Sequence, residues 1–218
     1  TALNYYTDQE ITIPLDPTMT PQENSQKYFA RYNKQKRTFE ALTELIRETA
    51  EDIQYLESIS NALDIAMNEA DLAQIKEELT QGGYIRRKFT KKKVKLTSKP
   101  LHYISSDGYH MYVGKNNLQN DELTFSFAVG NDWWFHAKGA PGSHVIVKTN
   151  GNELPDSTFE EAGRLAAYYS KNRGSDKVEI DYVEKKHVKK PNKAKPGFVV
   201  YYTNYSLVID SDISNIEN

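Results

Sequence analysis

Apolar residues recur along residues 28–67 at alternating steps of four and three positions. Nine of the twelve positions on this stripe are apolar, and neither glycine nor proline interrupts the segment. A seven-residue repeat of this kind is typical of a coiled-coil seam, which is narrower than the apolar face of a helix in a globular domain. The sequence therefore predicts a long helix whose seam consists of Tyr28, Tyr32, Gln35, Phe39, Leu42, Ile46, Thr49, Ile53, Leu56, Ser60, Leu63 and Met67.

This predicted helix has a clear start but no partner of matching length. Thr20 precedes Pro21, and Glu23 follows at the third helical position, an arrangement typical of a capped helix N-terminus. A shorter helix is expected near residues 71–81, ended by the glycine pair at 82–83. The alternative is an intramolecular hairpin between the two helices, but the second helix is too short to cover the seam. We therefore expect the seam to pair either with a helix from an upstream segment or with a second copy of the chain.

The pattern changes to short alternating segments after residue 100. Residues 101–106 and 109–114 alternate apolar and polar side chains around Asp107-Gly108, which favours a β-hairpin. Further strands are expected at Trp133–Ala137, Val145–Lys148, Val178–Val183, Phe198–Thr203 and Leu207–Ile209. Helices are expected over residues 120–129 and 157–170, the second capped by Asp156 or Ser157.

These patterns together predict the α+β class. We expect a long helical coiled-coil arm followed by a compact domain with a mainly antiparallel sheet and flanking helices. The expected boundaries are 1–83 for the arm, 84–100 for a basic linker and 101–212 for the compact domain.

The charge of the chain is divided between its two halves. Residues 1–80 carry 7 basic and 15 acidic side chains, a net charge of −8, whereas residues 81–218 carry 21 basic and 15 acidic side chains, a net charge of +6. Such asymmetry is typical of two modules with different partners. The basic side chains of the second half gather in two clusters, near residues 86–99 and 185–195, that contain no acidic residue.

Aromatic residues accompany both clusters, and the chain has 15 tyrosines. Cationic side chains beside aromatic rings suit RNA, because phosphates bind lysine and arginine while unpaired bases stack on rings. Pro191 and Pro196 predict that the segment 189–197 is a protruding basic arm. The alternative is a solvated surface without a ligand. The predicted RNA-binding residues are Arg86, Arg87, Lys88, Lys91, Lys92, Lys93, Lys185, Lys186, Lys189, Lys190, Lys193 and Lys195.

Residues 131–147 contain both tryptophans and two of the five histidines. Within them, residues 139–143 predict a tight turn whose backbone N–H groups could form an anion nest. Donors from His136, Lys138, Ser143 and His144 would then hold a phosphate. The alternative is a purely structural turn, with histidines bonded to buried backbone and tryptophans in the core.

Catalytic and metal sites are not expected here. Ser143, His144 and Asp132 have the residue types of a hydrolytic triad, but adjacent residues of a strand point to opposite faces. A metal held by Asp132, His136 and His144 is disfavoured because Asp132 and His136 lie four residues apart along an extended strand. With no cysteine, the chain has no disulfide and no thiolate ligand. We therefore expect no catalytic residue, no metal and no cofactor.

The chain also lacks targeting signals. No run of 18 apolar residues is present, so no membrane span is expected, and the N-terminus has no signal-peptide pattern. Because it begins at Thr1 rather than methionine, we expect a piece of a longer protein.

Several motifs in order resemble the NFACT family, and the resemblance covers nearly the whole chain. The segment 15–32 is similar to the coiled-coil middle region of that family. The RNA-binding NFACT-R domain is resembled by Gly114–Asp121, Asp132–Lys138, Pro141–Val145 and Lys190–Gly197. The residues that match its signature are Asp132, Trp133, His136, Lys138, Gly142, Ser143 and His144.

The resemblance implies a role in ribosome-associated quality control in the cytoplasm. Members bind the large ribosomal subunit that carries a stalled chain and recruit tRNA, alanine tRNA in bacteria, so that the chain gains a C-terminal tail. The ribosome makes the peptide bonds, so the resemblance implies no enzyme. The family's N-terminal domain and its helix-hairpin-helix region lie outside the matching residues, so tailing is not expected of this chain alone. Some members are described as binding fibronectin or fibrinogen, which implies a cell-surface adhesin as the alternative.

Overall fold

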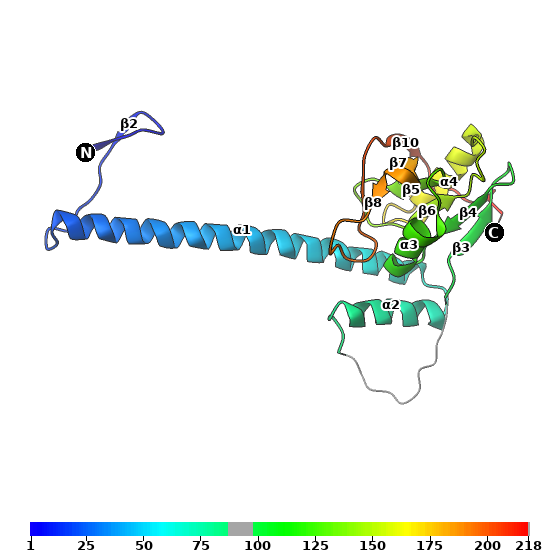
Figure 1. Ribbon diagram of the computed structural model, residues 1–218, viewed down its shortest axis with the longest axis horizontal. Helices are drawn as coiled ribbons and strands as arrows, with labels where there is room; N and C mark the ends of the chain where they lie inside the picture. Colours follow the sequence, from blue (N-terminus) through cyan, green and yellow to red (C-terminus); the bar gives the residue numbers. More distant parts are fainter. Residues whose placement is uncertain (87–97, 218) are drawn as a thin grey trace. The chain divides into compact units, whose positions relative to one another are not determined.

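The computed structural model describes residues 1–86 and 98–217 of the chain (Figure 1). The chain divides into two compact units, Thr1–Asp52 and Ile53–Asn218. This division falls inside the predicted arm 1–83, because the residues after Asp52 take part in the packing of the second unit. Among the described residues, no helix has both the length and the apolar character needed to cross a bilayer.

The first unit contains a short hairpin and the beginning of the long helix. Strands β1 (Ala2–Asn4) and β2 (Gln9–Ile11) pair in antiparallel fashion. Helix α1 (Pro21–Ile65) begins at the predicted residue. The Thr20 N–H donates to Glu23 Oε2 at 2.7 Å, and the Glu23 N–H donates to Thr20 Oγ1 at 3.2 Å. This reciprocal cap confirms the predicted helix start.

The predicted seam of α1 is exposed to solvent. Phe39 is 73% exposed and Ile46 is 68% exposed, and no segment within residues 1–86 and 98–217 covers them. Pairing of this seam in a coiled coil therefore stays a prediction. Met67, its last predicted position, lies beyond the end of α1, because the chain turns there into a second helix that Asn68 caps.

The C-terminal end of α1 packs against α2 (Glu69–Gln81) in the second unit. The contact is made by Tyr55 and Ile59 of α1 with Ile75 of α2. The seam residue Leu56 is not part of it and stays 42% exposed. The two helices therefore form a hairpin, but through a face of α1 that the seven-residue repeat does not mark.

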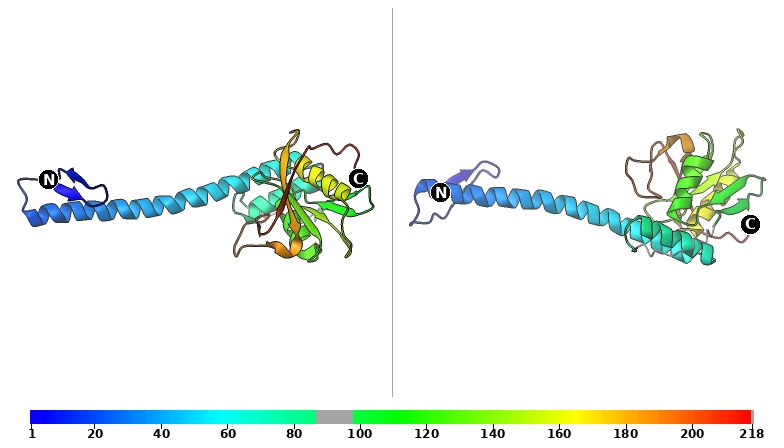
Figure 2. Two further views of the ribbon diagram at one scale, coloured as in Figure 1. Left: turned by 90° about the horizontal axis from the view of Figure 1, so that it is seen from above. Right: turned by 60° about the horizontal axis from the view of Figure 1, so that its bottom comes forward.

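A six-stranded antiparallel sheet forms the centre of the second unit, and Figure 2 gives two further views of it. Its strand order is β10-β7-β5-β6-β4-β3, which confirms the predicted α+β class with a mainly antiparallel sheet. The strands are β3 (Leu101–Ile104), β4 (His110–Val113), β5 (Trp133–Ala137), β6 (Val145–Val147), β7 (Val178–Glu184) and β10 (Tyr205–Ile209). The predicted hairpin at Asp107-Gly108 joins β3 to β4.

The two faces of the sheet bury different clusters, because neighbouring residues of a strand point to opposite sides. Phe135 packs on the face covered by helix α4 (Asp156–Tyr168). Trp134 packs on the other face, with Leu123 of the π-helical turn Leu123–Phe127. That turn continues helix α3 (Asn117–Glu122), so the predicted helix over 120–129 begins earlier and changes its winding.

Two predicted boundaries were wrong. Pro155 occupies the N-cap of α4, so the predicted caps Asp156 and Ser157 both lie inside the helix, and Ser157 donates its hydroxyl to Asp107 Oδ2 at 2.6 Å. The strand predicted over 198–203 shrinks to β9 (Val200–Tyr201), which pairs with β8 (Val188–Lys189) in a separate two-stranded ribbon.

Candidate nucleic-acid interface

The second basic cluster has regular structure in residues 185–189 only, and the segment 189–197, predicted as a protruding arm, continues as turns. It begins as a 3₁₀ turn, Lys185–His187, directly after β7 and continues into β8. The backbone N–H of Lys185 donates to Asp132 O at 2.8 Å. This bond and the β8–β9 pairing hold residues 185–189 on the second unit, and the Gly197 N–H, which donates to Asp121 Oδ1 at 3.1 Å, holds the end of the segment that follows.

The structure divides the lysines of this segment into two groups. Lys186 lies 2.5 Å from the Glu184 carboxylate, and Lys190 is ion-paired with Asp121. Lys195 donates to Tyr84 Oη at 3.0 Å. In contrast, Lys185, Lys189 and Lys193 form no ion pair with any carboxylate within residues 1–86 and 98–217.

Exposure separates the second group further. Lys189 and Lys193 are exposed, whereas Lys185 is half-buried. Lys189 and Lys193 are therefore the predicted residues of this segment best placed to reach a phosphate.

Of the first basic cluster, only the ends can be placed. Arg86 and Lys99 are exposed on either side of the gap in the described residues. The predicted residues Arg87, Lys88, Lys91, Lys92 and Lys93 lie outside the described residues.

Three of the signature residues stabilise the fold. Asp132 is completely buried, is ion-paired with Lys148 and accepts the Val129 N–H at 2.8 Å, so it closes the loop before β5. Trp133 packs edge-on against Phe159 of α4. Lys138 is exposed and ion-paired with Glu179 of β7.

The backbone donors predicted for an anion nest are partly in use. The Ser143 N–H donates to Tyr169 O at 2.9 Å, and the His144 N–H donates to Asn120 Oδ1 at 3.0 Å. Ser143 and His144 are therefore not free to supply backbone N–H groups to a phosphate. Anion binding by residues 139–142 stays a prediction.

His136, Gly142 and His144 instead line a cleft of about 330 Å³. Its walls come from the end of α1, the turn after β5 and the segment that follows the basic cluster. Its lining residues are Gln54, Tyr55, Glu57, Ser58, Asn117, Trp134, His136, Gly139, Ala140, Pro141, Gly142, His144, Pro196, Gly197, Phe198, Val199 and Tyr201.

Aromatic rings meet at this cleft. The ring centres of Trp134 and His136 lie 5.6 Å apart with nearly parallel planes. Tyr201 lies 4.9 Å from Trp134 on a tilted plane, and His144 meets Trp134 edge-on at 5.1 Å. Tyr201 is held in place because its hydroxyl donates to Asp181 Oδ2 at 2.7 Å.

Both imidazoles in the cleft are neutral at pH 7. Burial lowers the pKa of His136 to about 4, below its ordinary value of 6.5. Burial, reinforced by the neighbouring His136, also holds the pKa of His144 well below 6.5. His144 Nδ1 is hydrogen-bonded to Thr124 Oγ1 at 2.8 Å. A neutral imidazole has one N–H donor and one acceptor nitrogen, which suits an uncharged polar partner better than an anion.

Asp132, His136 and His144, which the sequence disfavoured as a metal set, do not lie together. Asp132 is ion-paired with Lys148 and does not line the cleft that His136 and His144 share. Within the described ranges, no three side chains of the ligating types gather closely enough to hold a metal ion.

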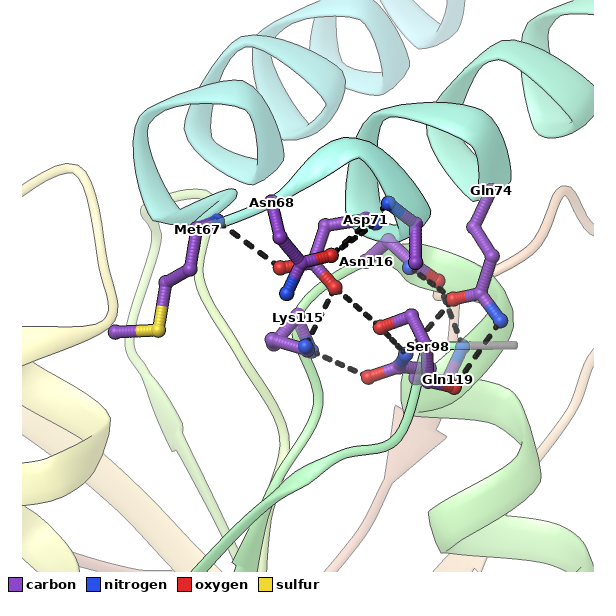
Figure 3. Close-up of polar contacts among 9 residues, drawn as sticks. Met67, Asn68, Asp71, Gln74, Ser98, Lys115, Asn116 and Gln119 are labelled. Atoms are coloured by element: carbon purple, nitrogen blue, oxygen red, sulfur yellow. Dashed lines mark hydrogen bonds and ion pairs between the residues drawn. The ribbon is translucent and has the colours of Figure 1, made fainter. Parts of the chain in front are cut away.

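A buried polar network connects the helical hairpin to the sheet (Figure 3). It joins Asp71 and Gln74 of α2 to the loop before α3: the Lys115 ammonium lies 2.5 Å from Asp71, and Asn116 Nδ2 donates to Gln74 Oε1 at 2.9 Å. Gln119 Nε2 donates to the same Gln74 oxygen at 2.8 Å. The polar motif 114–121 therefore fixes α2, and through it the end of α1, beside the cleft.

Sequence reasoning did not find the cleft residues Tyr55, Asn117 and Tyr201. Tyr55 belongs to the long helix, and nothing in the seven-residue repeat marks it. Asn117 Nδ2 donates to Ser58 Oγ at 2.7 Å and to Glu78 Oε1 at 2.9 Å, contacts that depend on the tertiary fold.

Comparison with known proteins places the chain in a family. Residues 1–98 match the family model of the NFACT N-terminal and middle domains, and residues 99–203 match that of the NFACT protein RNA-binding domain. The Rqc2 homologue RqcH of Streptococcus pneumoniae is 46% identical over 98% of this chain and 38% of its own length. The Rqc2 homologue RqcH of Bacillus subtilis is 41% identical, again over 98% of this chain and 38% of its own.

A solved structure agrees with the fold. The C-terminal part of the fibronectin/fibrinogen-binding protein from Streptococcus suis matches with a TM-score of 0.83 and 40% identity, over 93% of this chain and 82% of that one. The chain spans 38% of the length of the two curated relatives described above. Family models that together cover residues 1–203, and relatives of this identity, show that the chain belongs to the NFACT family.

Proposed function

We propose that this chain is part of a ribosome-associated quality control factor and that its second unit binds RNA through the basic segment 185–195. The observation that carries the proposal is the exposure of Lys189 and Lys193, which no described carboxylate pairs. Unpaired exposed ammonium groups on a fixed backbone attract phosphates and release counterions on contact. Two findings support the proposal: the second family model is that of an RNA-binding domain, and the relatives are named Rqc2 homologues.

The RNA proposed as the partner is rRNA and tRNA on large ribosomal subunits that carry a stalled chain. In this role the chain supports the C-terminal alanine tailing of nascent chains in the cytoplasm, and alanine tRNA is the tRNA recruited. The chain itself is proposed to catalyse no reaction, because the ribosome would form the peptide bonds of the tail. The structure around Ser143 supports this, because that side chain is only 2% exposed and His144 Nδ1 is already hydrogen-bonded to Thr124.

We also propose that the exposed seam of α1 pairs with a second helix. An apolar stripe that includes Phe39 and Ile46 is unfavourable in water, and burial in a coiled coil would remove it from solvent. The partner is either a helix from another part of a longer chain or a second copy of this one.

A second candidate function is binding of fibronectin or fibrinogen, in which case the chain would belong to a surface adhesin. It is favoured by the name of the matching structure from Streptococcus suis. The RNA and adhesin functions require different partners.

Binding measured side by side separates them. Immobilised chain would be titrated with large ribosomal subunits, tRNA and fibronectin over a salt series. We expect subunits and tRNA to bind with an affinity that falls steeply with salt, because phosphate contacts release counterions. Binding of fibronectin alone would overturn the RNA proposal and support fibronectin binding as the function.

A further inference from the structure

We propose that the cleft beside residues 139–142 takes one unpaired nucleobase of RNA, with the flanking phosphates bound by the adjoining lysines. This inference rests on the proposed RNA contact and specifies how part of that contact is made. It assigns a ligand to Trp134, His136 and Phe198, to which the proposed function gives no role.

The shape and the walls of the cleft suit a flat ring. A volume of about 330 Å³ lies at the low end of small-ligand sites, which begin near roughly 300 Å³. Tyr201 and Phe198 contribute rings to its lining, and the completely buried Trp134 lies beneath them. Unpaired bases bind proteins chiefly by stacking on such rings, whatever the base.

The polar groups of the cleft suit the edge of a base. The Trp134 side chain is completely buried, and its Nε1–H has no acceptor among the described residues. Buried polar groups in proteins are generally hydrogen-bonded, so this N–H favours a polar partner at the cleft. A base has carbonyl and ring-nitrogen acceptors, and the neutral His136 adds one donor or acceptor of its own.

Trp134 Nε1 is itself buried beneath the lining of the cleft. Phe198, at 40% exposure, is the most exposed ring of that lining, so a base can reach it without any rearrangement. Stacking on Phe198 is therefore the contact that the proposal most directly requires.

Positive charge lies at the end of the cleft where a phosphate would follow. Pro196 lines the cleft, and the ammonium of the preceding Lys195 lies 4.8 Å above the ring centre of Tyr55, another lining residue. Lys193 is exposed two residues earlier. The one acidic lining residue, Glu57, is ion-paired with Lys171 at 2.9 Å.

The backbone at this junction is held closely. Gly197 has a φ of +78°, and a Cβ atom there would lie 2.5 Å from Asn117 Oδ1. Its N–H donates to Asp121 Oδ1 at 3.1 Å, and Asp121 also pairs with Lys190. Asp121 thus holds both Lys190 of the basic segment and Gly197 of the cleft wall, which keeps the segment beside the cleft.

The test uses the intact 218-residue chain with Trp133→Phe, so that Trp134 is the only tryptophan. Its fluorescence would be titrated with a single-stranded RNA oligonucleotide and, separately, with AMP. We expect RNA to quench the emission saturably, because the base stacks within the cleft. AMP is expected to quench with much weaker affinity, since it offers one base and one phosphate only.

Phe198→Ala is the decisive variant, and Tyr202→Ala is its matched control. Tyr202 lies four residues further along, is 62% exposed and does not line the cleft. Removing a stacked ring should weaken RNA binding at least about fivefold, without changing its salt dependence, because no phosphate contact is lost. Tyr202→Ala should bind as the parent does, and circular dichroism would verify that both variants are folded.

Two outcomes would overturn the inference, and each has a separate meaning. If RNA binds Phe198→Ala as tightly as it binds the control, the cleft takes no base, while the proposed RNA contact stands. If AMP binds as tightly as RNA does, the site serves a free nucleotide rather than an RNA base. Absence of any RNA binding to the parent chain would remove the proposed function itself and this inference with it.

Discussion

The Lys115 ammonium lies 2.5 Å from the Asp71 carboxylate, and both side chains are almost completely buried. This ion pair crosses the boundary at residues 98 and 99 between the two matching family models. Asp71 belongs to α2, whereas Lys115 opens the polar motif that precedes α3 (Figure 3). The helical hairpin is therefore structurally part of the RNA-binding unit.

Asp71→Asn should strongly destabilise the second unit. The substitution leaves the Lys115 charge buried without its partner, a loss that typically costs about 3–5 kcal/mol. Urea unfolding followed by tryptophan fluorescence measures it, because both tryptophans lie in the second unit. Asp64→Asn, an exposed site on α1, is the control and should change the free energy of unfolding by less than about 0.5 kcal/mol.

If Asp71→Asn loses no more unfolding free energy than the control, Lys115 keeps its hydration. The ion pair of Asp71 and Lys115 would then not stabilise the helical hairpin. The double variant Asp71→Leu with Lys115→Met offers a second readout. Replacing both charges by apolar groups should restore part of the lost stability, since no buried charge is then unpaired, while the Met67 N–H, which donates to Asp71 Oδ2 at 2.9 Å, loses its acceptor.

The stability of the second unit should fall as the pH drops from about 6.5 toward 4. The pKa of His136 in the fold is about 4, below its ordinary value of 6.5, so the unfolded chain takes up a proton in this window that the folded chain does not. Uptake by the unfolded state lowers the free energy of unfolding, by about 1–2 kcal/mol between pH 7 and pH 5.

Urea unfolding at the two pH values gives this difference directly. His136→Gln should shrink it, because glutamine does not titrate. An equal pH dependence in parent and variant would show that His136 is not the group responsible.

The chain in isolation should self-associate through the exposed seam of α1. Light scattering should give a mass above that of a monomer, and Leu42→Glu should return it to the monomer by placing a charge in the seam. Glu48→Lys, an exposed position outside the seam, is the control. A parent chain that is monomeric at every concentration would leave only a helix from elsewhere as the partner.

Local patterns in the sequence were sufficient to predict some elements of the fold. The cap formed by Thr20 and Glu23 and the hairpin at Asp107-Gly108 depend on neighbouring residues only, and both were predicted at the right positions. The predicted N-cap of α4 was wrong. The Ser157 hydroxyl donates to Asp107, which is 50 residues away in the chain, rather than capping the helix.

The candidate site likewise combines features that the sequence predicts with features that depend on long-range contacts. The lysines of the basic segment could be named from composition, but the pairing of Lys190 with Asp121 spans 69 residues and has no local signature. Likewise, Tyr55 reaches the cleft only because α1 packs on α2. Which lysines remain available, and what lies beside them, therefore depends on long-range contacts.

The affinity of the chain for large ribosomal subunits across a salt series tests the central claim most directly. The variant is Lys189→Glu with Lys193→Glu. Its control, Lys177→Glu, is an exposed site just before β7, whereas the basic segment follows the other end of that strand. If both lysines contact phosphates, binding should weaken at every salt concentration, and the slope of log affinity against log salt should become shallower by about 1.4, or ~0.7 per lost contact. Affinity and slope equal to those of the control would contradict the claim that this segment binds RNA.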